Sequence, residues 1–145
     1  MIDIEAAGVN YVDGLFVSGE YQIKPPLPFV PGGEVAGTVG AVGDAVTDWA
    51  VGDRVLASVG LGGYASQAIA GAAQLTRIPD DMTSAAAAAF TQSYCTAIFS
   101  LTRRTRLREG EWLLVLGAAG GVGRGAIDVG KALGANVIAA ASSPE

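Results

Sequence analysis

The sequence predicts a mixed α/β protein, in which an irregular β domain precedes the first βαβ unit of a doubly wound parallel sheet. Short apolar runs broken by glycine and proline fill the first two-thirds of the chain, as is typical of irregular β structure. From Glu111 the pattern becomes strand, glycine turn, helix and strand, which indicates a parallel βαβ unit. We therefore expect two domains, over residues 1–90 and 91–145.

The first domain is expected to hold three strands after a proline-rich loop. The candidate strands are Val35 to Val42, Arg54 to Ser58 and Tyr64 to Ile69. Prolines at 25, 26, 28 and 31 exclude a helix or a central strand there, because proline lacks the backbone donor. Glu34 and Asp53 are interpreted as structural loop groups rather than as acids or bases.

A helix is predicted after residues 79–84, where Ser or Thr can cap the closely packing alanine run Ala85 to Ala89. We expect it to continue through Leu101, either unbroken or with one break. The arginines at 103, 104, 106 and 108 then fall at a helix end, where water solvates them. Cys95 has no disulfide partner and is predicted to be a small buried apolar residue.

Composition excludes several classes of function. Nine Lys and Arg against fourteen Asp and Glu give a net charge of -5, which offers no attraction to nucleic acid or to an anionic membrane. The absence of histidine excludes Ser-His-Asp and Cys-His catalysis and the common histidine-containing zinc sites. The single cysteine, with no signal-peptide pattern and no apolar run of membrane-spanning length, leads us to expect a cytoplasmic protein.

The βαβ unit carries the motif with chemical meaning. Trp112 to Leu116 is a continuous apolar run, as expected of a strand buried on both faces of a parallel sheet. A glycine turn over 117–123, a helix over Val122 to Leu133 and a strand over Asn136 to Ala141 follow. Such a turn directs free N–H groups and the positive end of the helix dipole at a diphosphate. The unit therefore predicts dinucleotide binding, with a purely structural turn as the alternative.

Residues of the turn have separate predicted roles. Gly120 and Gly121 let a ligand approach the main chain, while Gly123 lets the helix pack closely against the strand. Val122 completes the segment assigned to the cofactor. Ala118 departs from the dinucleotide fingerprint, whose first glycine falls at that position.

The end of the second strand favours one cofactor over the other. Ser142 and Ser143 follow it, where an NAD site usually has Asp or Glu for the ribose 2′-hydroxyl. Neutral hydroxyls do not repel a 2′-phosphate and can donate hydrogen bonds to it, which favours NADPH. The alternative is that both serines merely end a strand.

Several segments resemble the medium-chain dehydrogenase/reductases, specifically the zinc-free quinone oxidoreductases that include zeta-crystallin. The resemblance covers nearly the whole chain and rests on the glycine turn and on Ala6–Asn10, Pro28–Gly37, Val51–Val55 and Gly62–Ala65. It implies a GroES-like catalytic domain followed by a Rossmann domain. Zinc alcohol dehydrogenases of this superfamily have cysteine at the position of Asn10 and histidine at that of Gly33, so the resemblance points to the metal-free branch.

The resemblance also implies site residues. Asn10 would line the nicotinamide pocket and Thr96 would meet the nicotinamide amide. Tyr21 matches an aromatic pocket residue, which makes Asn10 and Tyr21 the catalytic candidates, while a second such tyrosine corresponds to Leu15 and is missing. As alternatives, Asn10 stabilises a turn, and Tyr21 packs among the neighbouring prolines and Phe29.

Without zinc or histidine, a simple ketone is a poor hydride acceptor, because its developing alkoxide lacks an electrophilic partner. A quinone or another α,β-unsaturated carbonyl spreads that charge, so we expect metal-free, NADPH-dependent reduction of such small molecules. Because family members have further structure on both sides, we expect the chain to be shortened at both ends. The alternative is an inactive fragment or a structural, crystallin-like protein with at most weak nucleotide binding. Family members are often homodimers, and the sequence leaves the oligomeric state of this chain open.

Overall fold

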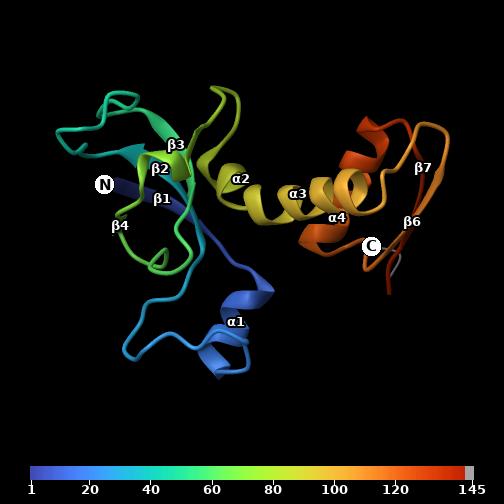
Figure 1. Cartoon of the computed structure of the whole chain (residues 1–145), viewed down its shortest axis with the longest axis horizontal. Helices are drawn as coiled ribbons and strands as arrows, with labels where there is room; N and C mark the ends of the chain where they lie inside the picture. Colours follow the sequence, from blue (N-terminus) through green and yellow to red (C-terminus); the bar gives the residue numbers. More distant parts are fainter. Residues whose placement is uncertain (143–145) are drawn as a thin grey trace. The chain divides into compact units, whose positions relative to one another are not determined.

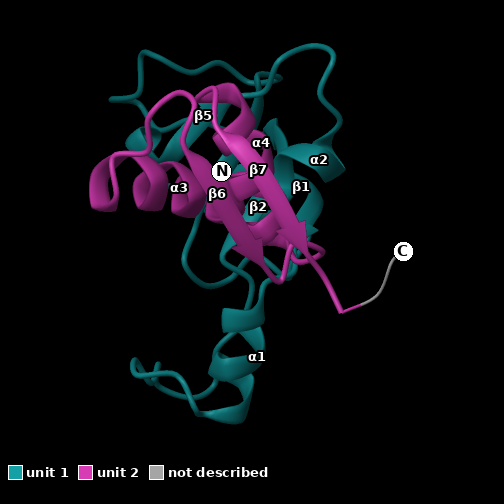
Figure 2. Cartoon of the chain, turned by 90° about the vertical axis from the view of Figure 1, so that its right-hand side faces the viewer, with its two compact units in different colours: residues 1–89 teal, residues 90–145 magenta. Residues whose placement is uncertain are grey.

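The chain divides into two compact units, Met1–Ala89 and Phe90–Glu145, which Figure 2 shows in teal and magenta. A computed structural model describes residues 1–142. Unit 1 contains an antiparallel sheet with helices, and unit 2 contains a parallel strand pair with helices (Figure 1). The mixed α/β fold class predicted from the sequence is thereby confirmed.

Unit 1 is built on a five-stranded sheet in the order β4-β1-β2-β3-β5, in which all paired neighbours are antiparallel. Its strands are β1 (Ile2–Gly8), β2 (Glu34–Val39), β3 (Arg54–Ser58), β4 (Gln67–Ala68) and β5 (Leu75–Arg77). The register of β1 against β2 shifts between Ile4 and Ala6, where β1 carries a bulge. Beyond the bulge, Gly8 pairs with Glu34, which brings the end of β1 beside the start of β2.

Side chains alternate along β2 and β3 and give the sheet two apolar faces. One face buries a cluster made of Ile2, Val35, Val39, Val55 and Ala57. The other face buries Ala36, Leu56 and Ile78 together with Ala87 and Ala88 of helix α2 (Ser84–Ala88). The sheet of unit 1 therefore has a packed core on each side.

The helices of unit 1 are short and their ends have local causes. Helix α1 (Tyr11–Ser18) ends at Gly19, whose φ of 72° is the left-handed conformation that glycine adopts without strain. Helix α2 begins after Thr83, whose hydroxyl accepts a hydrogen bond of 3.2 Å from the Ala86 N–H, as the capping pattern predicts. Its C-terminal end packs so closely on β1 that a Cβ at Gly8 would collide with the Ala88 carbonyl. Ala87 and Ala88 are buried and confirm the close packing predicted for the alanine run, whereas Ala85, Ala86 and Ala89 are exposed. A 3-10 turn, η1 (Ala72–Gln74), precedes β5.

Unit 2 contains the predicted βαβ unit, formed by β6 (Trp112–Leu116), α4 (Gly121–Ala132) and β7 (Asn136–Ala140). The strands are parallel and in register from Trp112 opposite Asn136 to Leu116 opposite Ala140. Helix α3 (Thr91–Ile98) precedes them and packs against α4. The π-helical turn η2 (Phe99–Arg104) continues α3, so the first two arginines of the basic cluster lie at a helix end as predicted.

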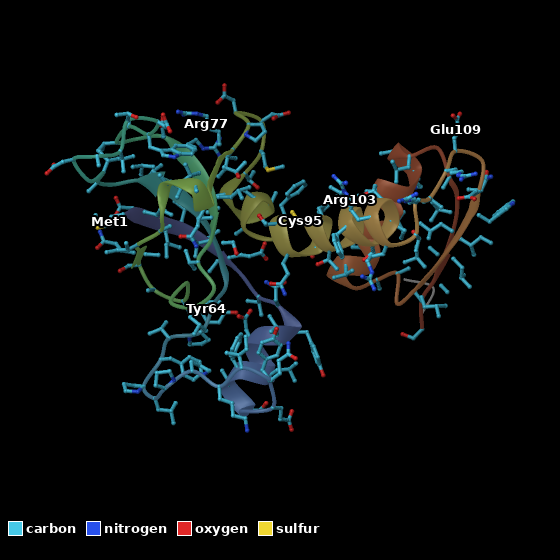
Figure 3. The ribbon with its side chains drawn as sticks, in the orientation of Figure 1. Met1, Tyr64, Arg77, Cys95, Arg103 and Glu109 are labelled. Carbon is cyan, nitrogen blue, oxygen red and sulfur yellow. The ribbon has the colours of Figure 1, made fainter. Side chains whose placement is uncertain are left out.

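Several sequence predictions are wrong in detail. The expected strand at 64–69 is reduced to Gln67–Ala68, whereas the break that the sequence allowed in the helix is present between α2 and α3. Within residues 1–142, β6 is not buried on both faces, because Trp112, Leu114 and Leu116 are 72%, 58% and 75% exposed. Cys95 is exposed on α3 rather than buried (Figure 3). Glu34 lies on strand β2, not in a loop.

Candidate functional site

The glycine turn of unit 2 joins β6 to α4 and leaves backbone donors open. Gly117, with φ of 68°, starts the turn, and its carbonyl accepts a 3.0 Å hydrogen bond from the Gly120 N–H. The first-turn N–H groups of α4, those of Gly121, Val122 and Gly123, stand at the helix end where no carbonyl of the helix itself can accept from them. The first turn of α4 carries no acidic side chain. These donors and the helix dipole suit an anion.

Glycine is required at different positions of the turn for different reasons. A Cβ at Gly123 would stand 2.9 Å from the Ala118 Cα and closer still to the Gly117 carbonyl oxygen, so Gly123 is needed for packing, as predicted. A Cβ at Gly121 would stand 2.8 Å from the Ser93 hydroxyl, so this glycine also serves packing. Gly120 has room, because its nearest contact would be an ordinary 3.4 Å to the Gly117 carbonyl, whereas Gly117 has open space but a left-handed φ of 68° that favours glycine.

The end of β7 lies beside the turn. The Ala118 N–H donates a 3.0 Å hydrogen bond to the Ala140 carbonyl, which ties the turn to the last residue of the strand. Ser142 follows two residues later and is exposed. A groove of about 510 Å³ lies at the turn, lined by residues of 113–117 and 120–123 and by Ala126. The turn and Ser142 thus share one edge of the parallel strand pair, while Ser143 lies outside the described residues.

In unit 1, Asn10 lines an open pocket of about 590 Å³. The pocket wall is largely apolar, and its polar groups are few. Its lining residues are Val9, Asn10, Tyr11, Asp13, Gly14, Leu15, Val17, Ser18, Glu20 and Tyr64. A small apolar pocket with a few converging polar groups is the usual form of a small-molecule site.

Asn10 is held on two sides by buried carboxylates. Its backbone N–H donates a 2.8 Å hydrogen bond to Asp13 Oδ2, and its side-chain Nδ2 donates one of 2.9 Å to Glu34 Oε2. Asp13 is 4% exposed and Glu34 is 3% exposed. Asn10 is therefore the N-cap residue of α1, which agrees with the alternative that it stabilises a turn. It also lines the pocket.

Tyr64 approaches the same group from a distant part of the sequence. Its hydroxyl donates a 3.0 Å hydrogen bond to Asp13 Oδ2 and lies 3.4 Å from the Gly8 carbonyl oxygen. Partial burial, followed by the hydrogen bond to Asp13, raises the pKa of the Tyr64 phenol above its ordinary value of 10.0. Figure 3 labels Tyr64 where the segment after β3 comes down to α1.

The structure gives Tyr21 neighbours other than this pocket. Its ring lies 4.6 Å from the ring of Phe16, which in turn lies 6.5 Å from that of Phe29. Tyr21 is not among the residues that line the pocket of Asn10. Thr96 is an exposed residue of α3 in unit 2.

Sequence reasoning missed Asp13 and Tyr64. The spacing Asn10-x-x-Asp13 is that of a capping box, in which the third helical residue reaches back to the N-cap N–H, and it was a usable signal for Asp13. No local pattern identifies Tyr64, since it lies 51 residues from its partner. In the described part of the chain, no three His, Cys, Asp or Glu side chains are grouped to hold a metal ion, and no helix is long and apolar enough to cross a membrane.

The chain is similar to known proteins in both sequence and structure. The family profile described as "Alcohol dehydrogenase GroES-like domain" matches residues 1–80. Rat "Quinone oxidoreductase-like protein 2" is 41% identical over 145 residues, which cover 99% of this chain and 41% of that protein. The chain thus spans less than half the length of this relative.

Two solved structures extend the comparison. The quinone oxidoreductase of Thermus thermophilus, whose complex with NADPH is also known, is 37% identical, with a TM-score of 0.85 over 99% of this chain and 44% of that one. CurK enoyl reductase is 30% identical, with a TM-score of 0.90 over 99% of this chain and 45% of that one. The similarity therefore extends through both units.

Proposed function

Because the chain belongs to the alcohol dehydrogenase GroES-like family, in the quinone oxidoreductase group of the medium-chain dehydrogenase/reductases, we propose that it serves metal-free reduction of a conjugated carbonyl by NADPH. Quinones are the first acceptors to consider, and enones or enoyl compounds are the next. The relatives named quinone oxidoreductase and enoyl reductase support these two acceptor types.

The open glycine turn of unit 2 is the observation that carries this proposal. Gly120 has space where a side chain would stand, and the first-turn N–H groups of α4 have no acceptor within the helix itself. A diphosphate fits such a turn, because it accepts hydrogen bonds and carries the charge that a helix N-terminus favours. Gly120, Gly121, Val122 and Gly123 would hold it.

The choice of NADPH over NADH rests on Ser142. This exposed side chain follows β7 at the edge of the strand pair that also carries the turn. A neutral hydroxyl can donate to a 2′-phosphate, whereas a carboxylate would repel it. The Thermus relative whose NADPH complex is known supports the same choice.

The acceptor is assigned to the pocket of Asn10. When bound, NADPH supplies the hydride, and the protein supplies placement and a shielded surface. Val9, Leu15 and Val17 give this pocket an apolar wall suited to a planar, uncharged ring. Asn10 is the polar side chain proposed to orient the reactants, with Tyr21 as a second catalytic candidate and Thr96 as the partner of the nicotinamide amide.

The chemistry of this residue set explains the preference for conjugated acceptors. Within residues 1–142, no metal-ligand cluster is present to stabilise an alkoxide. A conjugated carbonyl spreads the developing negative charge over several atoms, so hydrogen bonds suffice to stabilise it.

Turnover with paired acceptors tests the proposal. The chain, treated with a metal chelator, should oxidise NADPH with a small neutral quinone and should fail with a saturated ketone of similar size. Equal rates with both acceptors would overturn the preference for conjugation. Absence of turnover and of NADPH binding would instead favour the alternative of a catalytically inactive or structural chain.

A further inference from the structure

The surroundings of Asn10 extend the proposed function, on which the following inference rests. We propose that Asp13, Glu34 and Tyr64 are positioning residues, which together fix the backbone and the side-chain amide of Asn10 in its pocket. None of the three is assigned a role in the chemistry itself. They act through Asn10, so their effect on turnover should depend on its presence.

The backbone of Asn10 is fixed by Asp13. The carboxylate oxygen Oδ2 accepts hydrogen bonds from the Asn10 N–H at 2.8 Å and from the Tyr64 hydroxyl at 3.0 Å. Two donors on one oxygen leave this buried side chain little freedom to rotate. Tyr64 therefore restrains Asn10 although it does not touch it in a hydrogen bond.

The side-chain amide of Asn10 is fixed by Glu34. The amide nitrogen, not the amide oxygen, faces Glu34, because Nδ2 donates the 2.9 Å hydrogen bond and the carboxyl oxygen Oε2 accepts it. This hydrogen bond decides which way the amide is turned.

Tyr64 itself is held by the glycines around it. Gly32 has φ of 98°, and a Cβ there would stand 2.6 Å from Cδ1 of the Tyr64 ring. A Cβ at Gly63 would stand 2.8 Å from the Gly32 carbonyl oxygen. The loop thus brings the ring into a place that only glycine neighbours permit, and the ring carries the hydroxyl to Asp13.

A cap that merely stabilises α1 is the competing explanation, and a double-mutant cycle separates the two. Tyr64→Phe removes the hydroxyl and keeps the ring. We expect it to lower kcat for NADPH oxidation by a quinone about tenfold, with the Kd for NADPH unchanged. In the Asn10→Ala background the same substitution should have no further effect on kcat.

Two further substitutions complete the cycle. Glu34→Gln keeps the shape of the side chain but adds a donor, so the side-chain amide of Asn10 is free to turn. It should lower kcat in the unaltered chain and have no further effect on kcat in the Asn10→Ala background. Tyr94→Phe is the matched control, because its hydroxyl also donates to a carboxylate, Asp128, on the other unit. Tyr94→Phe should change kcat by the same factor in the unaltered chain and in the Asn10→Ala variant. An equal loss from Tyr64→Phe with and without Asn10, or no loss at all, would overturn the proposal.

Hydrogen exchange at the backbone N–H of Asn10 tests the positioning role separately from the proposed function. In the chain labelled for NMR, Tyr64→Phe should speed exchange of the Asn10 N–H about tenfold, whereas Tyr94→Phe should leave it unchanged. Unchanged exchange in Tyr64→Phe would refute the positioning role. Faster exchange in a chain without turnover would uphold the positioning role while the proposed function fails.

Discussion

Gly121 on α4 and Ser93 on α3 lie so close that a Cβ at Gly121 would stand 2.8 Å from the Ser93 hydroxyl oxygen. One helical turn later, a Cβ at Gly125 would stand 3.2 Å from the Ser93 carbonyl oxygen. Two glycines of α4 therefore allow the helix pair to approach closely. Packing thus accounts for Gly121 and Gly125, whereas ligand access is the role proposed for Gly120, and substitution can separate the two.

Alanine at Gly120 and at Gly123 should give opposite results. Gly120→Ala places its Cβ in ordinary 3.4 Å contact with the Gly117 carbonyl oxygen, at a φ of -76°, so stability should change little while NADPH affinity falls about tenfold. Gly123→Ala overpacks the turn and should cost about 1–3 kcal/mol of unfolding free energy. Urea unfolding and NADPH fluorescence titration measure the two effects.

Gly43→Ala serves as the control for both, because nothing lies within 4 Å of the added Cβ. It should change neither stability nor NADPH binding. If Gly120→Ala bound NADPH as tightly as the unaltered chain, the turn would be structural only.

The fold was predicted where local pattern and packing agree. Trp112–Leu116 was predicted to the residue as a strand, because a continuous apolar run between turn residues has few other solutions. For β1 and α1 the local signal is weak, because alternation in β1 covers only Ile2 to Glu5 and Tyr11–Ser18 has its apolar residues on several sides. Their formation depends on pairing with β2 and on the cap at Asn10.

The parts of the site that depend on local contacts were predicted from the sequence, whereas the parts that depend on long-range contacts were not. The turn of 117–123 is contiguous, so its spacing was informative. Tyr64 and Asp13 meet only because the sheet brings residues 51 positions apart together. The packing role of Gly121 depends on Ser93, which no pattern within the turn reveals.

Ser142→Asp should reverse the cofactor preference. A carboxylate there would accept hydrogen bonds from the 2′-hydroxyl of NADH and would repel the 2′-phosphate of NADPH. We expect affinity for NADPH to fall about tenfold, with NADH bound as well or better. Ser100→Asp, an exposed site on η2, adds the same charge as a control. Equal loss for both cofactors would show that Ser142 does not select between them.

Tyr21→Phe tests the second catalytic candidate. The substitution keeps the ring that stacks near Phe16 and removes only the hydroxyl. If the hydroxyl acts on the acceptor, kcat should fall about 10- to 100-fold with no change in the thermal midpoint. Unchanged kcat would leave Tyr21 as a packing residue of the aromatic group it forms with Phe16 and Phe29.

Alkaline pH should destabilise the fold through two tyrosines. Burial and Asp13 raise the pKa of Tyr64, and the hydrogen bond to Asp128 is the main cause that raises the pKa of Tyr94. Below pH 10.0, the ordinary tyrosine value, both hydroxyls are neutral in the folded and unfolded chain. As pH rises beyond it, the unfolded chain loses these protons first, so stability falls until the folded pKa values are passed.

The thermal unfolding midpoint, measured at a series of pH values from below to above 10.0, reports this loss of stability. The double variant Tyr64→Phe with Tyr94→Phe should start from a lower midpoint and lose less of it with rising pH. An identical pH slope in the double variant would show that other groups cause the alkaline loss.

Hydride transfer itself is most directly tested with NADPH deuterated at the transferring position of C4. The chelator-treated chain should oxidise this cofactor completely with a neutral quinone, and more slowly than it oxidises unlabelled NADPH. No consumption of either cofactor at any quinone concentration would contradict the account, and it would leave these 145 residues without the activity of their relatives.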